Sequence, residues 1–206
     1  RLMTAGFHEA NLLCKVKKRS ASTAKDIIHE GNVGMYDAVI LGRRGISRLE
    51  ELINDSVSMG ALDQDRISPL WICRKPELDR SNVLVCIDGS EPSLSIADHV
   101  GFMLKNQPGH DVTLFAVNKK GAEVPDKTFD QAHKALIDNG FPEQQIHRRT
   151  QTASDPAGAI EKEASSGRYA AVAVGSSGEA KEGFFKIGSV SKKLCYSLSG
   201  ATLMIR

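Results

Sequence analysis

Residues 83–93 read Val-Leu-Val-Cys-Ile-Asp-Gly-Ser-Glu-Pro-Ser, passing from a strand-like run through a turn into a helix. The first five residues form a short apolar run rich in β-branched side chains, which is typical of a buried strand. The triplet Asp-Gly-Ser is a turn signal, and apolar residues then recur at helical spacing up to Leu104. We therefore expect a strand, a tight turn and a helix over residues 83–104.

The same alternation continues to the end of the sequence. Further strands are expected at residues 112–117, 146–149, 170–174 and 202–205, and further helices at residues 129–139, 156–165 and 190–198. Pro156 favours a helix start, because it follows Ser154 and Asp155, two good N-cap residue types. Strands and helices in alternation predict an α/β fold, a doubly wound parallel sheet with helices on both faces.

An internal repeat relates the first part of the chain to the last. Five matches carry it, among them residues 36–42 (Tyr-Asp-Ala-Val-Ile-Leu-Gly) with 169–175 (Tyr-Ala-Ala-Val-Ala-Val-Gly), 56–58 with 189–191 (Ser-Val-Ser in both), and 69–72 with 202–205. Matches in one register indicate two copies of one unit. The second copy begins near Ser81. The first lacks counterparts of the first two strands, which we expect either upstream of Arg1 or from a partner.

Composition excludes several classes of protein. A chain of 206 residues that is 41% hydrophobic and 25% charged is typical of a globular protein. With 27 Lys+Arg against 25 Asp+Glu, the charge is too balanced for a dedicated nucleic-acid binder. No apolar run approaches the roughly 20 residues that cross a bilayer. The four cysteines and six histidines lack zinc-site spacing, so we expect a cytoplasmic protein with reduced thiols.

The strongest chemical signal combines residues 174–178, Val-Gly-Ser-Ser-Gly, with residues 188–191, Gly-Ser-Val-Ser. The first segment follows a strand, at the carboxyl edge where doubly wound sheets bind ligands, and its glycines allow a close approach to an anion. The second segment opens a helix, whose N–H groups and dipole attract phosphate. Its two serine hydroxyls add donors. The pair predicts a phosphate-binding loop, although an ordinary turn would explain the first segment alone.

Asp88 follows the strand at residues 83–87 and falls at the same sheet edge by topology. A carboxylate there can accept hydrogen bonds from ribose hydroxyls or hold a Mg²⁺ ion that bridges phosphates. The alternative is a turn or N-cap residue before the next helix. The local sequence is compatible with both roles.

Residues 81–206 resemble the universal stress proteins. The resemblance is carried by residues 83–93, by the strand Thr-Leu-Phe-Ala-Val at residues 113–117, and by the Gly-x2-Gly-x9-Gly-Ser signature just described. It implies a five-stranded parallel sheet in the order 3-2-1-4-5, in tandem, with a fifth strand that pairs antiparallel between domains or subunits. Residues 77–206 would be a complete second domain, and residues 1–76 the C-terminal part of a first.

In the ATP-binding branch of that family, the glycine signature wraps the triphosphate and ribose. The resemblance therefore implies ATP, with or without Mg²⁺, and a homodimer or an intramolecular pseudo-dimer. Asp88 would lie near the ribose and metal, and the backbone of Val117, with Ile87 alongside, would border adenine. The signature residues are Gly175, Gly178, Gly188, Ser189, Val190 and Ser191. Ser177 departs from the family, which often has arginine there.

The first copy departs further, because Asp55 replaces the last glycine of its signature, which begins at Gly42. A carboxylate 4 Å from a phosphate charge repels it by up to roughly 4 kcal/mol at an effective dielectric near 20. A tenfold loss of affinity needs only about 1.4 kcal/mol. We therefore expect nucleotide in the second copy only.

No Walker motif or Gly-x-Ser-x-Gly elbow is present. We expect a stress-responsive regulatory protein that binds ATP or another adenine nucleotide and acts on a protein partner. One alternative is a slow ATPase or phosphotransferase that uses Asp88 and a metal. The other is a nucleotide-free interaction domain, such as the regulatory end of a transporter.

Overall fold

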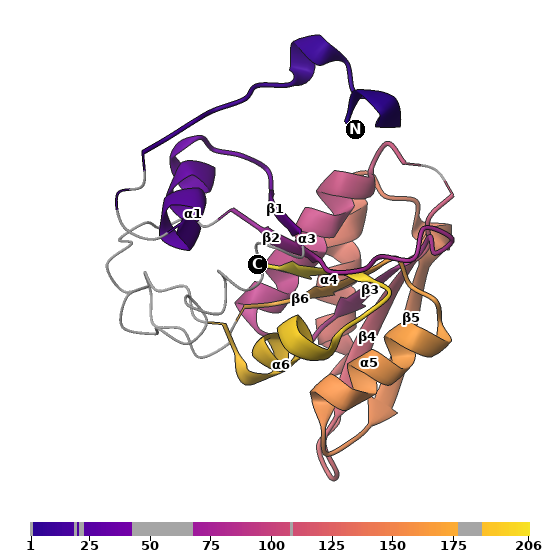
Figure 1. Ribbon diagram of the computed structural model, residues 1–206. Coiled ribbons are helices and arrows are strands. Elements are labelled where there is room, and N and C mark those ends of the chain that lie inside the picture. The colour runs from indigo at the N-terminus through magenta and orange to yellow at the C-terminus, as the bar shows by residue number, and fades with distance from the viewer. Residues whose placement is uncertain (1, 19, 21–22, 43–67, 108, 177–186) are drawn as a thin grey trace.

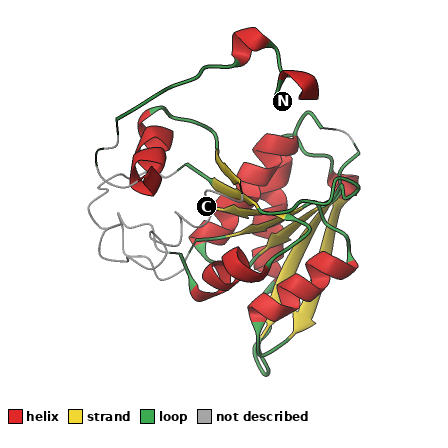
Figure 2. Ribbon diagram, viewed as in Figure 1, coloured by secondary structure: helices red, strands yellow, loops and turns green. Residues whose placement is uncertain are grey.

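A computed structural model describes residues 2–18, 20, 23–42, 68–107, 109–176 and 187–206. One sheet runs through these residues, with helices against both of its faces (Figures 1 and 2). The strands are β1 (Val39–Gly42), β2 (Leu70–Cys73), β3 (Val83–Cys86), β4 (Val112–Asn118), β5 (Ile146–Thr152), β6 (Ala171–Val174) and β7 (Thr202–Ile205). The α-helices are α1 (Thr23–Val33), α3 (Glu91–Leu104), α4 (Asp126–Asp138), α5 (Pro156–Ser166) and α6 (Ser189–Ser197). The described part of the chain also has the 3-10 turns η1 (Met3–Ala5), η2 (Glu9–Asn11) and η4 (Glu143–Gln145).

The strands and helices expected after residue 83 are all present, with ends that move by a few residues. The sheet order is β1-β2-β7-β6-β3-β4-β5. Read from β5 to β7, this contains the expected order 3-2-1-4-5, with parallel neighbours throughout. Because β3 pairs parallel with both β4 and β6, the carboxyl ends of these three strands lie side by side, at what we call the carboxyl edge of the sheet.

The expectation of a five-stranded sheet is wrong for the sheet as a whole, which has seven strands among the described residues. β2 pairs with β7 antiparallel and β1 pairs with β2 parallel, so the sheet is parallel except at one junction. The register of the junction is Leu70↔Ile205, Trp71↔Met204 and Ile72↔Leu203. The physical reason is that β7 would otherwise leave a row of backbone hydrogen-bonding groups unpaired. The antiparallel contact of the final strands agrees with the expectation from the resemblance.

Alternating side chains divide the core into two layers. Leu84 and Phe115 belong to the layer that contains Ile160 of α5 and Leu194 of α6, which we call the α5/α6 face. Val85 belongs to the layer under α3 and α4, the α3/α4 face. Both neighbours on β3 are completely buried, which explains its continuous apolar sequence. Among the described residues, no helix is both long and apolar enough to cross a membrane.

Candidate functional site

The carboxyl end of β3 leads directly into the turn that carries Asp88. The N–H of Ile87 donates to the carbonyl of Phe115 at 2.9 Å, and its buried side chain lies in the core of the α3/α4 face. The carboxylate Oδ1 of Asp88 accepts from the N–H of Ser90 at 3.0 Å and from its hydroxyl at 2.6 Å. Asp88 therefore has the turn role that the sequence allowed, and its Oδ2 is the candidate acceptor for a ligand.

Opposing effects set the charge of Asp88. Partial burial raises the pKa of this carboxyl, but the hydrogen bonds from Ser90, together with smaller effects that include Ser93, outweigh burial, so its pKa lies below its ordinary value. The group is therefore a carboxylate at neutral pH. The described residues contain no cluster of three or more histidine, cysteine, aspartate or glutamate side chains suited to a metal. A cation here would depend on Asp88 together with ligand phosphates, which is a usual arrangement for Mg²⁺.

The two ends of the glycine signature meet at this sheet edge. The N–H of Gly188 donates to the carbonyl of Ser176 at 2.5 Å, and the hydroxyl of Ser191 donates to the carbonyl of Gly175 at 2.7 Å. Gly178, which we expected in the same loop, lies outside the described residues. The start of α6 is thus fixed beside the end of β6.

Gly175 is a glycine for a reason that sequence reasoning missed. A Cβ atom added there would lie 2.8 Å from the backbone nitrogen of Ser93 and 2.9 Å from the carbonyl carbon of Pro92. Contacts this short with backbone leave no room for a side chain. The end of β6 therefore packs against the first turn of α3, where the hydroxyl of Ser93 accepts from the N–H of Asp88 at 3.4 Å. This packing brings the glycine signature next to the turn that holds Asp88.

The first turn of α6 supplies hydrogen-bond donors. Gly188 is the N-cap residue, and the following N–H groups have no acceptor within the helix itself. Ser189 is exposed, so both its hydroxyl and its N–H can reach a ligand. The expectation for the Ser191 hydroxyl needs correction: it is buried and donates to Gly175. Ser191 therefore retains only its N–H as a donor for a ligand.

Half-buried apolar side chains flank these donors. Val117 near the end of β4, Val190 of α6 and Cys86 of β3 all pack against the core of the α5/α6 face. Burial raises the pKa of the Cys86 thiol, so it is neutral and acts as a small apolar group. Ile87 points to the opposite face, so only its backbone can border a ligand on this side. The alternation of β3 could have identified Cys86, because it lies two residues before Asp88.

Arg206 is a second residue that sequence reasoning missed. Its carbonyl accepts from the N–H of Ser176 at 2.6 Å, and its N–H donates to the carbonyl of Val174 at 3.3 Å. This role follows from the β6–β7 register, for which the sequence has no local signal.

In the first copy, Gly42 ends β1, while Asp55 lies outside the described residues.

Residues 80–206 match the model of the universal stress protein family. A universal stress protein from Archaeoglobus fulgidus DSM 4304 is 20% identical, with a TM-score of 0.59 over 88% of this chain and 64% of that one. A functionally unknown protein from Pseudomonas aeruginosa PAO1 is 12% identical, with a TM-score of 0.53 over 90% of this chain and 68% of that one. This chain thus spans less than two thirds of the A. fulgidus protein.

A further solved structure is a universal stress protein in complex with cAMP, 19% identical, with a TM-score of 0.49 over 61% of this chain and 94% of that one. No curated protein matches the chain. At these identities, the solved structures with TM-scores above 0.5 show a shared fold. Since the family model covers more than half of the sequence, this chain belongs to the universal stress protein family.

Proposed function

We propose that this chain is a regulatory protein that binds one adenine nucleotide, ATP with or without Mg²⁺, at the carboxyl edge of β3, β4 and β6. The observation that carries the proposal is the hydrogen bond between Gly188 and Ser176, which places the start of α6 at that edge. The N–H donors at the start of α6 then lie next to the turn that holds Asp88, whose carboxylate is charged at neutral pH. The sequence resemblance to the ATP-binding branch of the family favours ATP among anionic ligands.

Each part of the nucleotide has a candidate partner among the described residues. The phosphates would accept from the N–H groups of Ser189 and Val190 and from the Ser189 hydroxyl; Gly178, which the resemblance also implies, lies outside the described residues. The ribose hydroxyls, or a phosphate-bound Mg²⁺, would meet Asp88. Adenine would lie against the half-buried side of Val117. This assigns polar groups to the charged end of the nucleotide and apolar surface to its base.

We propose that the chain binds the nucleotide without hydrolysing it efficiently. The carboxylate of Asp88 has a pKa below its ordinary value and accepts two hydrogen bonds from Ser90, so it is a weak general base at neutral pH. A bound nucleotide would instead act by shifting populations, favouring whichever conformational state binds it more tightly. The partner that reads this change would be a protein.

The same proposal includes a pseudo-dimer of two related domains, residues 1–76 and 77–206. The β2–β7 register supports it. Trp71 pairs with Met204, its own counterpart in the repeat, and on either side of this pair Leu70 meets Ile205 and Ile72 meets Leu203. A twofold axis between Trp71 and Met204 would produce this symmetric exchange.

Calorimetry with ATP tests the site through one position. Gly188 has φ −66° and ψ 164°, a conformation open to any residue, and both Asp and Asn are favourable N-caps. Gly188→Asp should retain α6 but weaken ATP binding at least tenfold, because repulsion of up to roughly 4 kcal/mol exceeds the required 1.4 kcal/mol. Gly188→Asn, the matched uncharged control, should remain within about threefold of the parent, a difference under about 0.7 kcal/mol.

Native mass spectrometry should find one ATP per chain, because the first copy already carries aspartate at the position equivalent to Gly188. Equal ATP affinities of Gly188→Asp and Gly188→Asn would show that the start of α6 does not contact the phosphates. No heat with ATP at millimolar concentration would overturn the proposed function.

A further inference from the structure

A chain of contacts leads from the glycine signature to Trp71, the single tryptophan of the sequence, and Arg206 is its central link. The backbone of Arg206 bonds Ser176 and Val174, as described above. Its guanidinium Nη1 extends to α3, where it lies 3.4 Å from both the carboxylate Oδ2 of Asp98 and the carbonyl of Ser95. Both distances are longer than those of a typical N–H···O hydrogen bond, so the guanidinium is held only weakly on α3.

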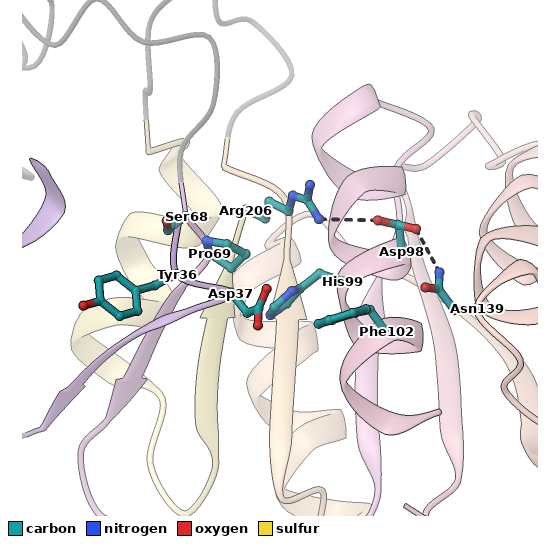
Figure 3. A pocket seen from close by; sticks show the side chains of 9 residues that line it. All are labelled: Tyr36, Asp37, Ser68, Pro69, Asp98, His99, Phe102, Asn139 and Arg206. Atoms are coloured by element: carbon teal, nitrogen blue, oxygen red, sulfur yellow. Dashed lines mark hydrogen bonds and ion pairs between the residues drawn. The ribbon is translucent and has the colours of Figure 1, made fainter. Parts of the chain in front are cut away.

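The side chain of Arg206 also lines a cavity of about 160 Å³ between the two repeat copies (Figure 3). Asp98, His99 and Phe102 of α3 form one side of the cavity, and residues 36–37 and 68–69, just before β1 and β2, form the other. Asp98 is held on its second oxygen by the amide of Asn139 at 2.8 Å. A displacement of Arg206 would therefore act on α3 next to His99.

His99 joins α3 to β2. It is only 3% exposed, and its Nε2 accepts from the Nε1–H of Trp71 at 3.0 Å, with the two rings edge-to-face at 5.8 Å. Because Nε2 accepts this hydrogen bond, the neutral imidazole carries its proton on Nδ1. The surroundings of the Trp71 indole thus depend on how α3 presents His99.

We propose that Arg206 couples nucleotide binding to the packing of β2 on α3, and this inference rests on the proposed function. A ligand that shifts the Ser176–Gly188 connection shifts the Arg206 carbonyl bonded to Ser176, and the guanidinium then changes its hold on Asp98 beside His99. Coupling of this kind is reciprocal: a change at the contact between the copies alters nucleotide affinity by the same factor. Arg206 is a positioning residue in this scheme and does not touch the nucleotide through its side chain.

The test combines Trp71 fluorescence with calorimetry on the full chain. ATP should change the Trp71 emission with a midpoint equal to the calorimetric Kd. Arg206→Ala keeps the backbone bonds to Ser176 and Val174, so ATP should still bind, with Kd altered about three- to tenfold, but the emission change should fall by at least half. Arg148→Ala is the matched control, because Arg148 of the edge strand β5 forms a comparably exposed ion pair with Asp130 of α4, and β5 is four strands away from β7, the strand that Arg206 follows.

The outcomes separate the coupling from the proposed function. ATP binding without any change in Trp71 emission would overturn the coupling and leave the function intact. An undiminished change in Arg206→Ala, or an equal loss in Arg148→Ala, would also overturn it. Absence of calorimetric binding by the parent chain would overturn both proposals. Full response in the parent and Arg148→Ala, with loss in Arg206→Ala, supports Arg206 as the link.

Discussion

Gly175→Ala should destabilise the protein although it adds a single methyl group. The new Cβ would sit 2.8 Å from the nitrogen of Ser93 and 2.9 Å from the carbonyl carbon of Pro92, both of which are backbone atoms. Backbone cannot rotate away as a flexible side chain does, so α3 or β6 must shift. Overpacking of this kind costs about 1–3 kcal/mol. At about 2–4 °C per kcal/mol for a chain of this size, the melting temperature should fall by several degrees.

The repeat provides a matched control at Gly42, the counterpart of Gly175. Among the residues that the structure describes, none would lie within 4 Å of a Cβ there. Gly42→Ala should therefore be neutral or stabilise by up to about 1 kcal/mol, because alanine restricts the unfolded chain. Urea unfolding followed by circular dichroism measures both variants without nucleotide. Equal stabilities of the two variants would refute the close packing of β6 on the first turn of α3 and, with it, the placement of the signature beside Asp88.

Two further predictions concern buried polar groups. Burial and the nearby Arg206 cation lower the pKa of His99 from 6.5 to about 4. Between pH 6.5 and pH 4 the unfolded chain therefore binds a proton more readily than the folded chain does. The free energy of unfolding should fall by about 3 kcal/mol over this range, at 1.36 kcal/mol per pH unit. Unfolding titrations of His99→Gln should show a shallower fall, and an unchanged slope would contradict the assignment. Ser191→Ala removes the donor to the Gly175 carbonyl and should cost about 1–2 kcal/mol in urea unfolding while changing the ATP Kd less than Gly188→Asp does; a tenfold weaker Kd would mean that the hydroxyl contacts the ligand.

The alternation of strands and helices was predictable because each local signal agreed with the final fold. The apolar run of β3 is buried on both faces, and Gly140 closes α4 with a positive φ of 85°. Such residues report their surroundings through period and turn chemistry. The extent of the sheet was less predictable, because addition of β1 and β2 at β7 depends on a contact between segments far apart in the sequence.

The elements that flank the candidate site were predictable from the sequence, but their contacts were not. The signature marked the end of β6 and the start of α6, yet it could not reveal that Gly175 packs closely against Pro92 or that the Ser191 hydroxyl already donates a hydrogen bond. Both facts arise from packing between elements. Arg206 had no motif at all, since its role depends on which backbone groups the strand register brings together.

Amide NMR with ATP tests the central claim most directly. In a ¹⁵N–¹H titration of the labelled chain, the amide signals of Asp88, Ser189 and Val190 should shift together and saturate at one equivalent, while those of the outer strand β5 stay in place. Saturating ATP that leaves these three amides unmoved, or that shifts β5 instead, would contradict the account.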